Sequence, residues 1–113
     1  MHELSIAQNI LDIIEETFSE NNYKELLEVR VRIGELVAVV PESLSFCYES
    51  LIKDTKYEKS KLTIEIIRVQ ASCKNCRREF NPKEFLFICP FCQSKEIEVL
   101  QGNELNISHL DVN

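Results

Sequence analysis

The sequence predicts an α+β fold in which two helices pack on a small, roughly three-stranded mixed sheet, with a four-cysteine module inserted before the last strand. Three observations support this prediction. Apolar residues near the N-terminus recur at helical intervals, and two later segments alternate apolar and polar residues as strands do. Two Cys-x-x-Cys pairs then follow. The expected order is helix, strand, helix, strand, cysteine module and strand.

The first expected element is an amphipathic helix over residues 4–20. Its apolar residues recur at intervals of three and four, which places them on one face of a helix. Asn21 and Asn22 break this pattern. The residues that should face the sheet are Leu4, Ala7, Leu11, Ile14 and Phe18, widened by Ile6, Ile10 and Ile13.

A strand and a second helix should follow. Over residues 27–33, apolar side chains alternate with charged ones as far as Gly34, the pattern of a strand with one buried face. Pro41 suits the first position of a helix, where its missing N–H costs nothing, and Glu42 suits the positive end of the helix dipole. The expected core residues are Leu27, Val29, Val31 and Ile33 of the strand and Leu44, Cys47, Tyr48 and Leu51 of the helix. Cys47 is therefore interpreted as a buried structural thiol.

The second half of the chain predicts further strands. Residues 62–69 alternate, with Leu62, Ile64 and Ile66 on one face. Residues 96–100 and 105–110 also favour strands, separated by a kink at Gly102-Asn103.

The cysteine module has the spacing of a zinc site. Twelve residues separate its two pairs, and four thiolates can surround one tetrahedral Zn(II) at about 2.3 Å. Four sulfurs close the coordination shell, so this Zn(II) is expected to be structural. Because the module is too small to bury a useful core, the metal must hold it together. The expected zinc ligands are Cys73, Cys76, Cys89 and Cys92.

The charge balance argues against nucleic acid as a partner. The formal net charge is −6, and a zinc ion with four thiolates brings it to about −8 by simple counting. Nucleic-acid binders instead concentrate positive charge on one face. No apolar run can span a bilayer, and the first twenty residues contain five acidic residues and no Lys or Arg, unlike a secretory signal. We therefore expect a cytoplasmic protein without membrane contact.

The first residues contain a potential chelating set. The α-amine of Met1, the backbone nitrogen of His2 and the His2 Nδ1 can close a five-membered and a six-membered ring around one ion. The backbone or carboxylate of Glu3 could add a donor, and such nitrogen-rich planar sets suit Ni(II) or Cu(II). The alternative is that His2 is simply exposed and that Glu3 serves the start of the helix.

Several short motifs occur together in one order. They are Met1-His2-Glu3-Leu4-Ser5, Ile33-Gly34-Glu35-Leu36, Val40-Pro41-Glu42-Ser43-Leu44, the cysteine quartet and Gln101-Gly102-Asn103-Glu104-Leu105. In this combination the chain resembles the HypA family of nickel-insertion accessory proteins, which serve [NiFe]-hydrogenase maturation and, in some organisms, urease. The resemblance covers essentially the whole chain.

The resemblance implies a metallochaperone function. It implies a nickel site at the Met1 amine, His2 and the Glu3 backbone, with Ni(II) as transferred cargo and Zn(II) as a structural ion. Glu42 is a weaker candidate for completing the nickel shell. The implied partners are a HypB-type GTPase and the hydrogenase large subunit, with urease accessory proteins as further candidates. We expect a monomer or weak homodimer, with a nickel-binding α/β domain at 1–70 plus 101–113 and a zinc-ribbon domain at 71–100.

Two rival functions stay open at the level of the sequence. One is a zinc-ribbon protein-interaction or nucleic-acid-binding module without nickel transfer, which the acidic charge disfavours. The other is a thiol–disulfide oxidoreductase, although two matched Cys-x-x-Cys pairs are more typical of metal ligands. The chain offers no Ser-His-Asp set, phosphate-binding glycine loop or catalytic carboxylate pair, so we do not expect an enzyme.

Overall fold

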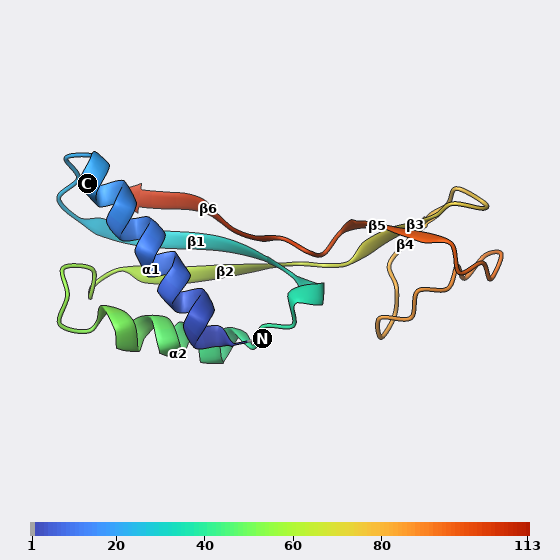
Figure 1. The fold of residues 1–113 in the computed structure, drawn as a ribbon, viewed down its shortest axis with the longest axis horizontal. Coiled ribbons are helices and arrows are strands. Elements are labelled where there is room, and N and C mark those ends of the chain that lie inside the picture. The colour runs from blue at the N-terminus through green and yellow to red at the C-terminus, as the bar shows by residue number, and fades with distance from the viewer. Residues whose placement is uncertain (1) are drawn as a thin grey trace.

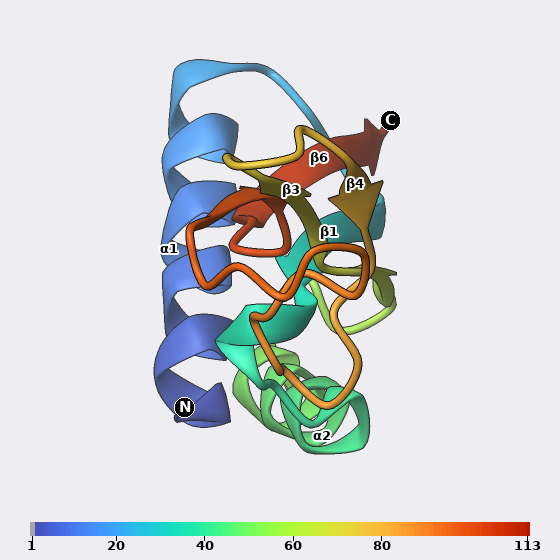
Figure 2. The same cartoon turned by 90° about the vertical axis from the view of Figure 1, so that its right-hand side faces the viewer.

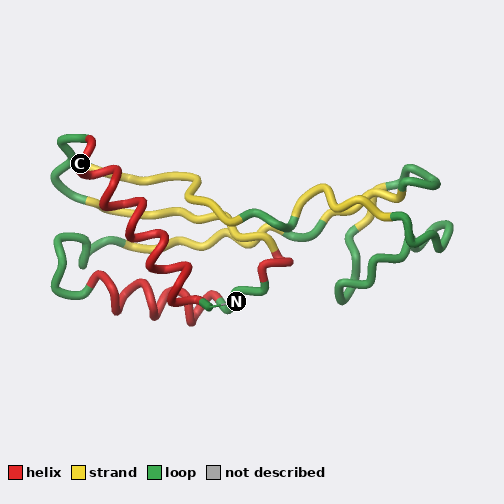
Figure 3. The backbone as a smooth tube through the Cα atoms, viewed as in Figure 1, coloured by secondary structure: helices red, strands yellow, loops and turns green. Residues whose placement is uncertain are grey.

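The computed structural model describes residues 2–113 and shows an elongated molecule of 55 × 25 × 16 Å with two sheets arranged along its long axis (Figure 1). Both α-helices lie in one half, and the second sheet and its loops form the other (Figure 3). The elements are α1 (Glu3–Glu20), β1 (Leu26–Gly34), the 3-10 turn η1 (Glu35–Val37), α2 (Pro41–Ile52), β2 (Lys61–Ile67), β3 (Gln70–Cys73), β4 (Glu79–Phe80), β5 (Ile97–Gln101) and β6 (Leu105–Val112). The predicted α+β architecture is confirmed.

The first sheet is mixed, as predicted. Its order is β2-β1-β6, with β1 parallel to β2 and antiparallel to β6. The helices α1 and α2 pack on this sheet and against each other, and their N-terminal ends meet (Figures 1 and 2). The main core consists of the side chains enclosed between these helices and the sheet. None of the helices in residues 2–113 combines the length and apolar character needed to cross a membrane.

The apolar stripe of α1 is narrower than predicted. The fully enclosed residues lie around Ala7, Leu11 and Ile14, whereas Leu4 is 57% exposed and Ile13 is 46% exposed. An amphipathic helix buries only the centre of a wide stripe, because residues at its edges extend past the neighbouring element. The placement of Leu4 and Ile13 in the core was therefore wrong.

The strand pattern also departs from simple alternation at two places. Leu26 is buried and Leu27 is 39% exposed, because the pairing of β1 with β6 shifts register between Leu26 and Glu28. A β-bulge adds one residue to one strand and so reverses which face the next side chain occupies. On β2, Ile66 is 42% exposed, near the end of the strand that extends beyond both helices, and Ile67 is buried instead.

The second sheet is antiparallel, with order β4-β3-β5. The predicted strand over 62–69 is divided, since β2 ends at Ile67 and β3 begins at Gln70 in this other sheet. The small core beneath the second sheet consists of Ala71, Cys73, Phe80 and Cys89, with Cys76 and Ile97 packed against it. So small an apolar cluster cannot stabilise a fold without further cross-links.

A hydrogen-bonded junction joins the two sheets. The Leu36 N–H donates to the Gly102 carbonyl at 2.9 Å, and the Gly34 N–H donates to the Glu104 carbonyl at 2.7 Å. The Glu35 carboxylate accepts from the Val69 N–H at 2.9 Å. A Cβ at Gly34 would lie 1.9 Å from the Gly102 carbonyl oxygen, so only glycine permits this approach.

Candidate metal centres

The four predicted zinc ligands lie together at the far end of the second sheet. Their sulfur atoms are all within 4.8 Å of one another, and two pairs, Cys73–Cys92 and Cys76–Cys89, are 3.5 Å apart. Four sulfurs bound tetrahedrally at 2.3 Å from Zn(II) would be about 3.8 Å apart. The cluster therefore fits a Zn(II) ion and a zinc-ribbon module.

The two Cys-x-x-Cys turns share one backbone geometry. In each turn, the carbonyl of the first cysteine accepts a 2.8 Å bond from the N–H four residues later. The N–H of that cysteine donates a 2.9 Å bond to the carbonyl five residues later. Arg77 and Gln93, at equivalent positions, have φ values of 62° and 63°. The repeated turn therefore presents both pairs of sulfurs in the same way.

Polar groups around part of the quartet favour thiolates. The Cys76 N–H lies 3.4 Å from the Cys73 sulfur, and the Phe91 N–H lies 3.4 Å from the Cys89 sulfur. The Asn75 side chain donates to the Cys92 sulfur and, with a backbone N–H from Ser94, lowers the pKa of that thiol to about 6. Zinc binds the thiolate form, so these donors favour metal binding at those sulfurs. The pKa of Cys76 is instead raised to about 11, because the backbone hydrogen bond from Arg78 is outweighed by burial and by the neighbouring sulfurs.

The N-terminal candidate site is built differently. His2 is exposed at the N-cap of α1, and its carbonyl accepts from the Ile6 N–H at 3.2 Å. The Glu3 carboxylate accepts from the Val40 N–H at 3.2 Å, and this bond is the main cause of the lowered pKa of Glu3. Glu3 therefore ties the start of α1 to the start of α2. Met1 lies outside the described residues.

An open pocket of about 510 Å³ lies between these two helix starts. Glu42, which the sequence could not place near His2, lies in this pocket with it. Cys47 is half-buried; it packs against the main core and also lines the pocket, so its interpretation as a purely internal thiol was incomplete. The lining residues are His2, Glu3, Leu4, Glu42, Ser43, Phe46 and Cys47.

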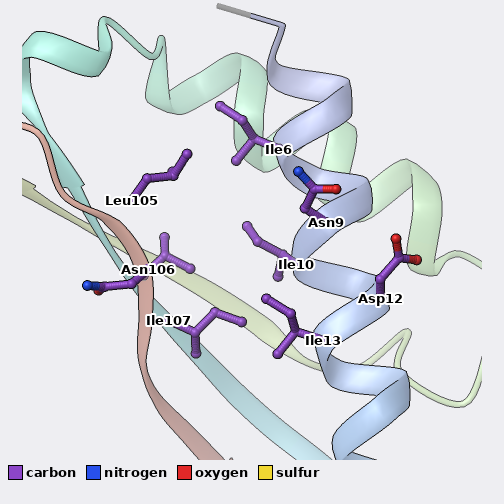
Figure 4. Close-up of a pocket in the computed structure, with 9 residues that line it drawn as sticks. Ile6, Asn9, Ile10, Asp12, Ile13, Leu105, Asn106 and Ile107 are labelled. Atoms are coloured by element: carbon purple, nitrogen blue, oxygen red, sulfur yellow. The ribbon is translucent and has the colours of Figure 1, made fainter.

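Within residues 2–113, the cysteine quartet is the single assembled group of three or more His, Cys, Asp or Glu side chains that could hold an ion. His2, Glu3, Glu42 and Cys47 line the same pocket, but their possible ligand atoms do not form such a group. His109, the second histidine, is exposed on β6. A different depression of about 420 Å³ lies between α1 and β6 (Figure 4). Its lining is mainly Ile and Leu, with Asp12 as its one charged residue, and does not resemble a metal site.

The family assignment follows from comparison with known proteins. A family model described as "Hydrogenase/urease nickel incorporation, metallochaperone, hypA" matches residues 1–112. The chain belongs to the HypA family. The hydrogenase maturation factor HypA of Desulfitobacterium hafniense is 33% identical over 112 residues, covering 99% of this chain and 98% of that protein. The HypA of Lawsonia intracellularis is 39% identical over 118 residues, covering 99% of each.

Solved HypA structures share the fold. The solution structure of the Ni metallochaperone HypA from Helicobacter pylori matches with a TM-score of 0.67 and 28% identity, covering 99% of this chain and 97% of that chain. A second HypA solution structure matches with a TM-score of 0.73 and 27% identity, covering 100% and 97%. HypA proteins are nickel metallochaperones of hydrogenase maturation, so the recognition made from the sequence motifs is confirmed.

Proposed function

We propose that this protein binds Ni(II) at its N-terminus and delivers it during [NiFe]-hydrogenase maturation, using the Met1 amine, His2 and the Glu3 backbone. The observation that carries the proposal is membership of a nickel metallochaperone family over residues 1–112, a match that includes the N-terminal motif. The exposed position of His2 at the N-cap of α1 supports the proposal.

The start of a helix suits this ligand set. The first N–H groups of an α-helix have no acceptor within the helix, so the backbone nitrogen of Glu3 is not committed to the helical ladder. His2 precedes the helix with extended backbone angles of −85° and 103°. The backbone nitrogens of His2 and Glu3 and the imidazole of His2 can therefore bind a common ion without unwinding α1. Nitrogen donors of this kind suit Ni(II).

The second half of the proposal concerns Zn(II). We assign the structural ion to Cys73, Cys76, Cys89 and Cys92, whose sulfur spacing fits a tetrahedral ion. A closed shell leaves no position for cargo, so zinc would stabilise the ribbon and nickel would bind elsewhere. On this proposal, residues 71–100 form a zinc-ribbon domain and residues 1–70 with 101–113 form the nickel-binding domain.

Delivery requires partners. We propose a HypB-type GTPase and the hydrogenase large subunit as the partners, with urease accessory proteins to be tested beside them. A cytoplasmic location suits these partners and keeps the cysteine quartet reduced. The role proposed is binding and transfer, without catalysis.

The test is isothermal titration of Ni(II) into zinc-loaded protein with its native N-terminus. We expect about one Ni(II) per chain at micromolar affinity or tighter, and at least a 100-fold loss of affinity in His2→Ala, because that substitution removes the ligand that closes one chelate ring. His109→Ala is the matched control, since it removes an exposed histidine from β6 and should leave binding unchanged. Equal binding by wild type and His2→Ala would refute the N-terminal assignment.

A further inference from the structure

Large apolar side chains are exposed in the half of the molecule that lacks the helices (Figure 1). Phe85 is 50% exposed, Leu86 is 60% exposed and Phe91 is 53% exposed. Phe85 and Leu86 belong to a turn in which the Leu86 N–H donates to the Lys83 carbonyl at 2.9 Å. Glu84 and Phe85 in this turn have left-handed φ values of 52° and 60°, which cost free energy in residues that carry a side chain. The strained turn therefore leaves two apolar side chains in water.

A pocket of about 610 Å³ is shared by this turn and the second Cys-x-x-Cys turn. Lys83 and Leu86 line the pocket from the first turn, and Pro90 and Gln93 line it from the second. Phe80, from the small core, also contributes to the lining. A mainly apolar pocket with one cation on its wall can accept an apolar side chain of another molecule that has an acidic group nearby.

An arginine held by an aromatic ring connects the two Cys-x-x-Cys turns. The Arg78 carbonyl accepts from the Cys73 N–H at 2.9 Å, which fixes the Arg78 backbone in the first turn. The Arg78 guanidinium lies 4.8 Å from the centre of the Phe91 ring, and Phe91 directly follows Pro90 of the pocket. A guanidinium over a ring face can still bind a carboxylate through the N–H groups at its edge, with two parallel hydrogen bonds. Arg78 is thus positioned to receive an anion beside the pocket.

The cations around this surface have no carboxylate partner. Both ion pairs that form among residues 2–113 lie on the first sheet. Five of the thirteen Lys and Arg residues lie in 70–101, with four of the nineteen acidic residues, so the rest of the chain carries the whole excess of negative charge. Residues 74–84 contain two carboxylates, Glu79 and Glu84, and four exposed cations, which are Lys74, Arg77, Arg78 and Lys83.

We propose that this surface binds an acidic segment of a partner protein, with a carboxylate on Arg78 and an apolar side chain in the pocket beside Lys83 and Leu86. Such a segment is complementary both to the unpaired cations and to the exposed apolar side chains. Nucleic acid is less complementary, because Zn(II) with four thiolates brings the net charge of residues 70–101 to about −1, whereas a phosphate backbone attracts an excess of positive charge. This inference goes beyond the proposed nickel function and uses no residue of the N-terminal pocket.

The test is selection of short random peptides, displayed on phage, against the zinc-loaded protein. We expect the selected sequences to combine Asp or Glu with aromatic or aliphatic residues. A selected peptide is then synthesised with a fluorescent label and titrated by fluorescence anisotropy. We expect Arg78→Gln and Lys83→Gln each to weaken its binding about tenfold, since each substitution removes a charge-assisted bond. High salt should weaken binding by the wild type.

Matched variants separate the surface from the fold. Leu86→Ser should also weaken binding, because it removes apolar contact at the pocket. Lys59→Gln is the control, since Lys59 is an exposed cation outside residues 70–101, and it should bind the peptide as wild type does. Zinc content and circular dichroism, measured on every variant, establish that the cysteine quartet and the fold are intact.

Several results would overturn the proposal. They are the selection of no peptide, the selection of peptides without acidic residues, and equal affinity of the selected peptide for wild type and Arg78→Gln. A labelled single-stranded DNA that binds more tightly than the peptide would instead assign the surface to nucleic acid. Self-association in sedimentation that Arg78→Gln abolishes would assign it to a second copy of the chain. Ni(II) titration of Arg78→Gln should match wild type, so failure of this proposal leaves the nickel function standing.

Discussion

The cysteine quartet and the N-terminal pocket differ in how much of each site exists before an ion arrives. The quartet has its four sulfur atoms within 4.8 Å of one another, and Cys73 and Cys89 are fully buried. Around the pocket, His2 is exposed, and the possible donors come from two separate helices. A preassembled, buried shell favours retention of its ion, whereas an open site at a chain end can be taken apart by a partner. The contrast is the one expected of a small chain that keeps one metal and exchanges another, as proposed above.

The largest expected effect comes from removing zinc. Structural Zn(II) sites contribute about 10–16 kcal/mol, far more than the small core of the second sheet can supply. We expect Cys89→Ser to lose zinc and to unfold residues 71–100 while most of the helical circular dichroism remains, because both helices belong to the other half. Metal analysis and circular dichroism provide the measurement.

A strong chelator added to wild type should reproduce the effect of Cys89→Ser. Cys47→Ser is the matched control, since its thiol lies outside the quartet, and it should keep its zinc. Simultaneous loss of all secondary structure would show that the two halves fold as one unit, against the proposed domain division.

The next largest effect should come from the junction between the two regions. The Cβ of Gly34→Ala would clash with the backbone of Gly102. Backbone atoms cannot rotate away from a clash as the end of a side chain can. We expect a loss of about 3 kcal/mol or more in the free energy of unfolding, measured by urea denaturation. Ala38→Gly provides the control, because Ala38 has φ of 58° and glycine relieves that strain, so this variant should be as stable as wild type or more so. Full stability of Gly34→Ala would mean that the junction is loose.

The smallest effect should come from the charge of Glu3. The Val40 N–H holds the pKa of Glu3 below its ordinary value of 4.5, so the charged form stabilises the folded state. This contribution is present above the unfolded-state pKa and disappears as the pH falls through the lower folded-state pKa. Glu3→Gln should therefore lower the melting temperature by a few degrees at neutral pH. At a pH well below the lowered folded-state pKa of Glu3, the two proteins should melt together.

Nickel titration of Glu3→Gln sharpens the comparison further. If the ligand is the backbone nitrogen of Glu3, nickel affinity should stay within about threefold of wild type. A much larger loss would identify the carboxylate as a ligand.

The melting temperatures of wild type and Glu3→Gln are measured by scanning fluorimetry from acid to neutral pH. A difference in melting temperature that is equal at every pH would contradict the role given to the charge of Glu3.

Local pattern predicted the elements well and their long-range contacts poorly. The helical period of α1 and the cysteine spacing are properties of neighbouring residues, so both could be predicted. The bulge near Leu27 depends on pairing with β6, about eighty residues later, and no alternation within β1 indicates it. The end of β2 at Ile67 likewise depends on a change of sheet.

The sequence placed Cys47 only in the helical core for the same reason. Its position beside His2 depends on the meeting of two helix starts, which a bond between Val40 and Glu3 joins across 37 positions of sequence. The helix period correctly predicted that Cys47 shares a face with Leu44 and Tyr48, but it carries no information about which residues lie opposite that face. The family resemblance drew attention to Glu42, and the pocket now places it near His2.

The chain enters and leaves the second sheet at a single place. A Cβ at Gly102 would lie 3.0 Å from the Cα of Val69, so the two ends of the intervening segment touch. When the two ends of an inserted segment lie next to each other, the flanking residues keep their positions whatever the length of the segment. Such a segment connects to the rest of the fold in the same way as a surface loop. We therefore expect that the segment from 70 to 101 can be replaced as a unit. Evolution or an engineer could replace it with another metal-bound or metal-free unit while leaving the helices and their sheet in place.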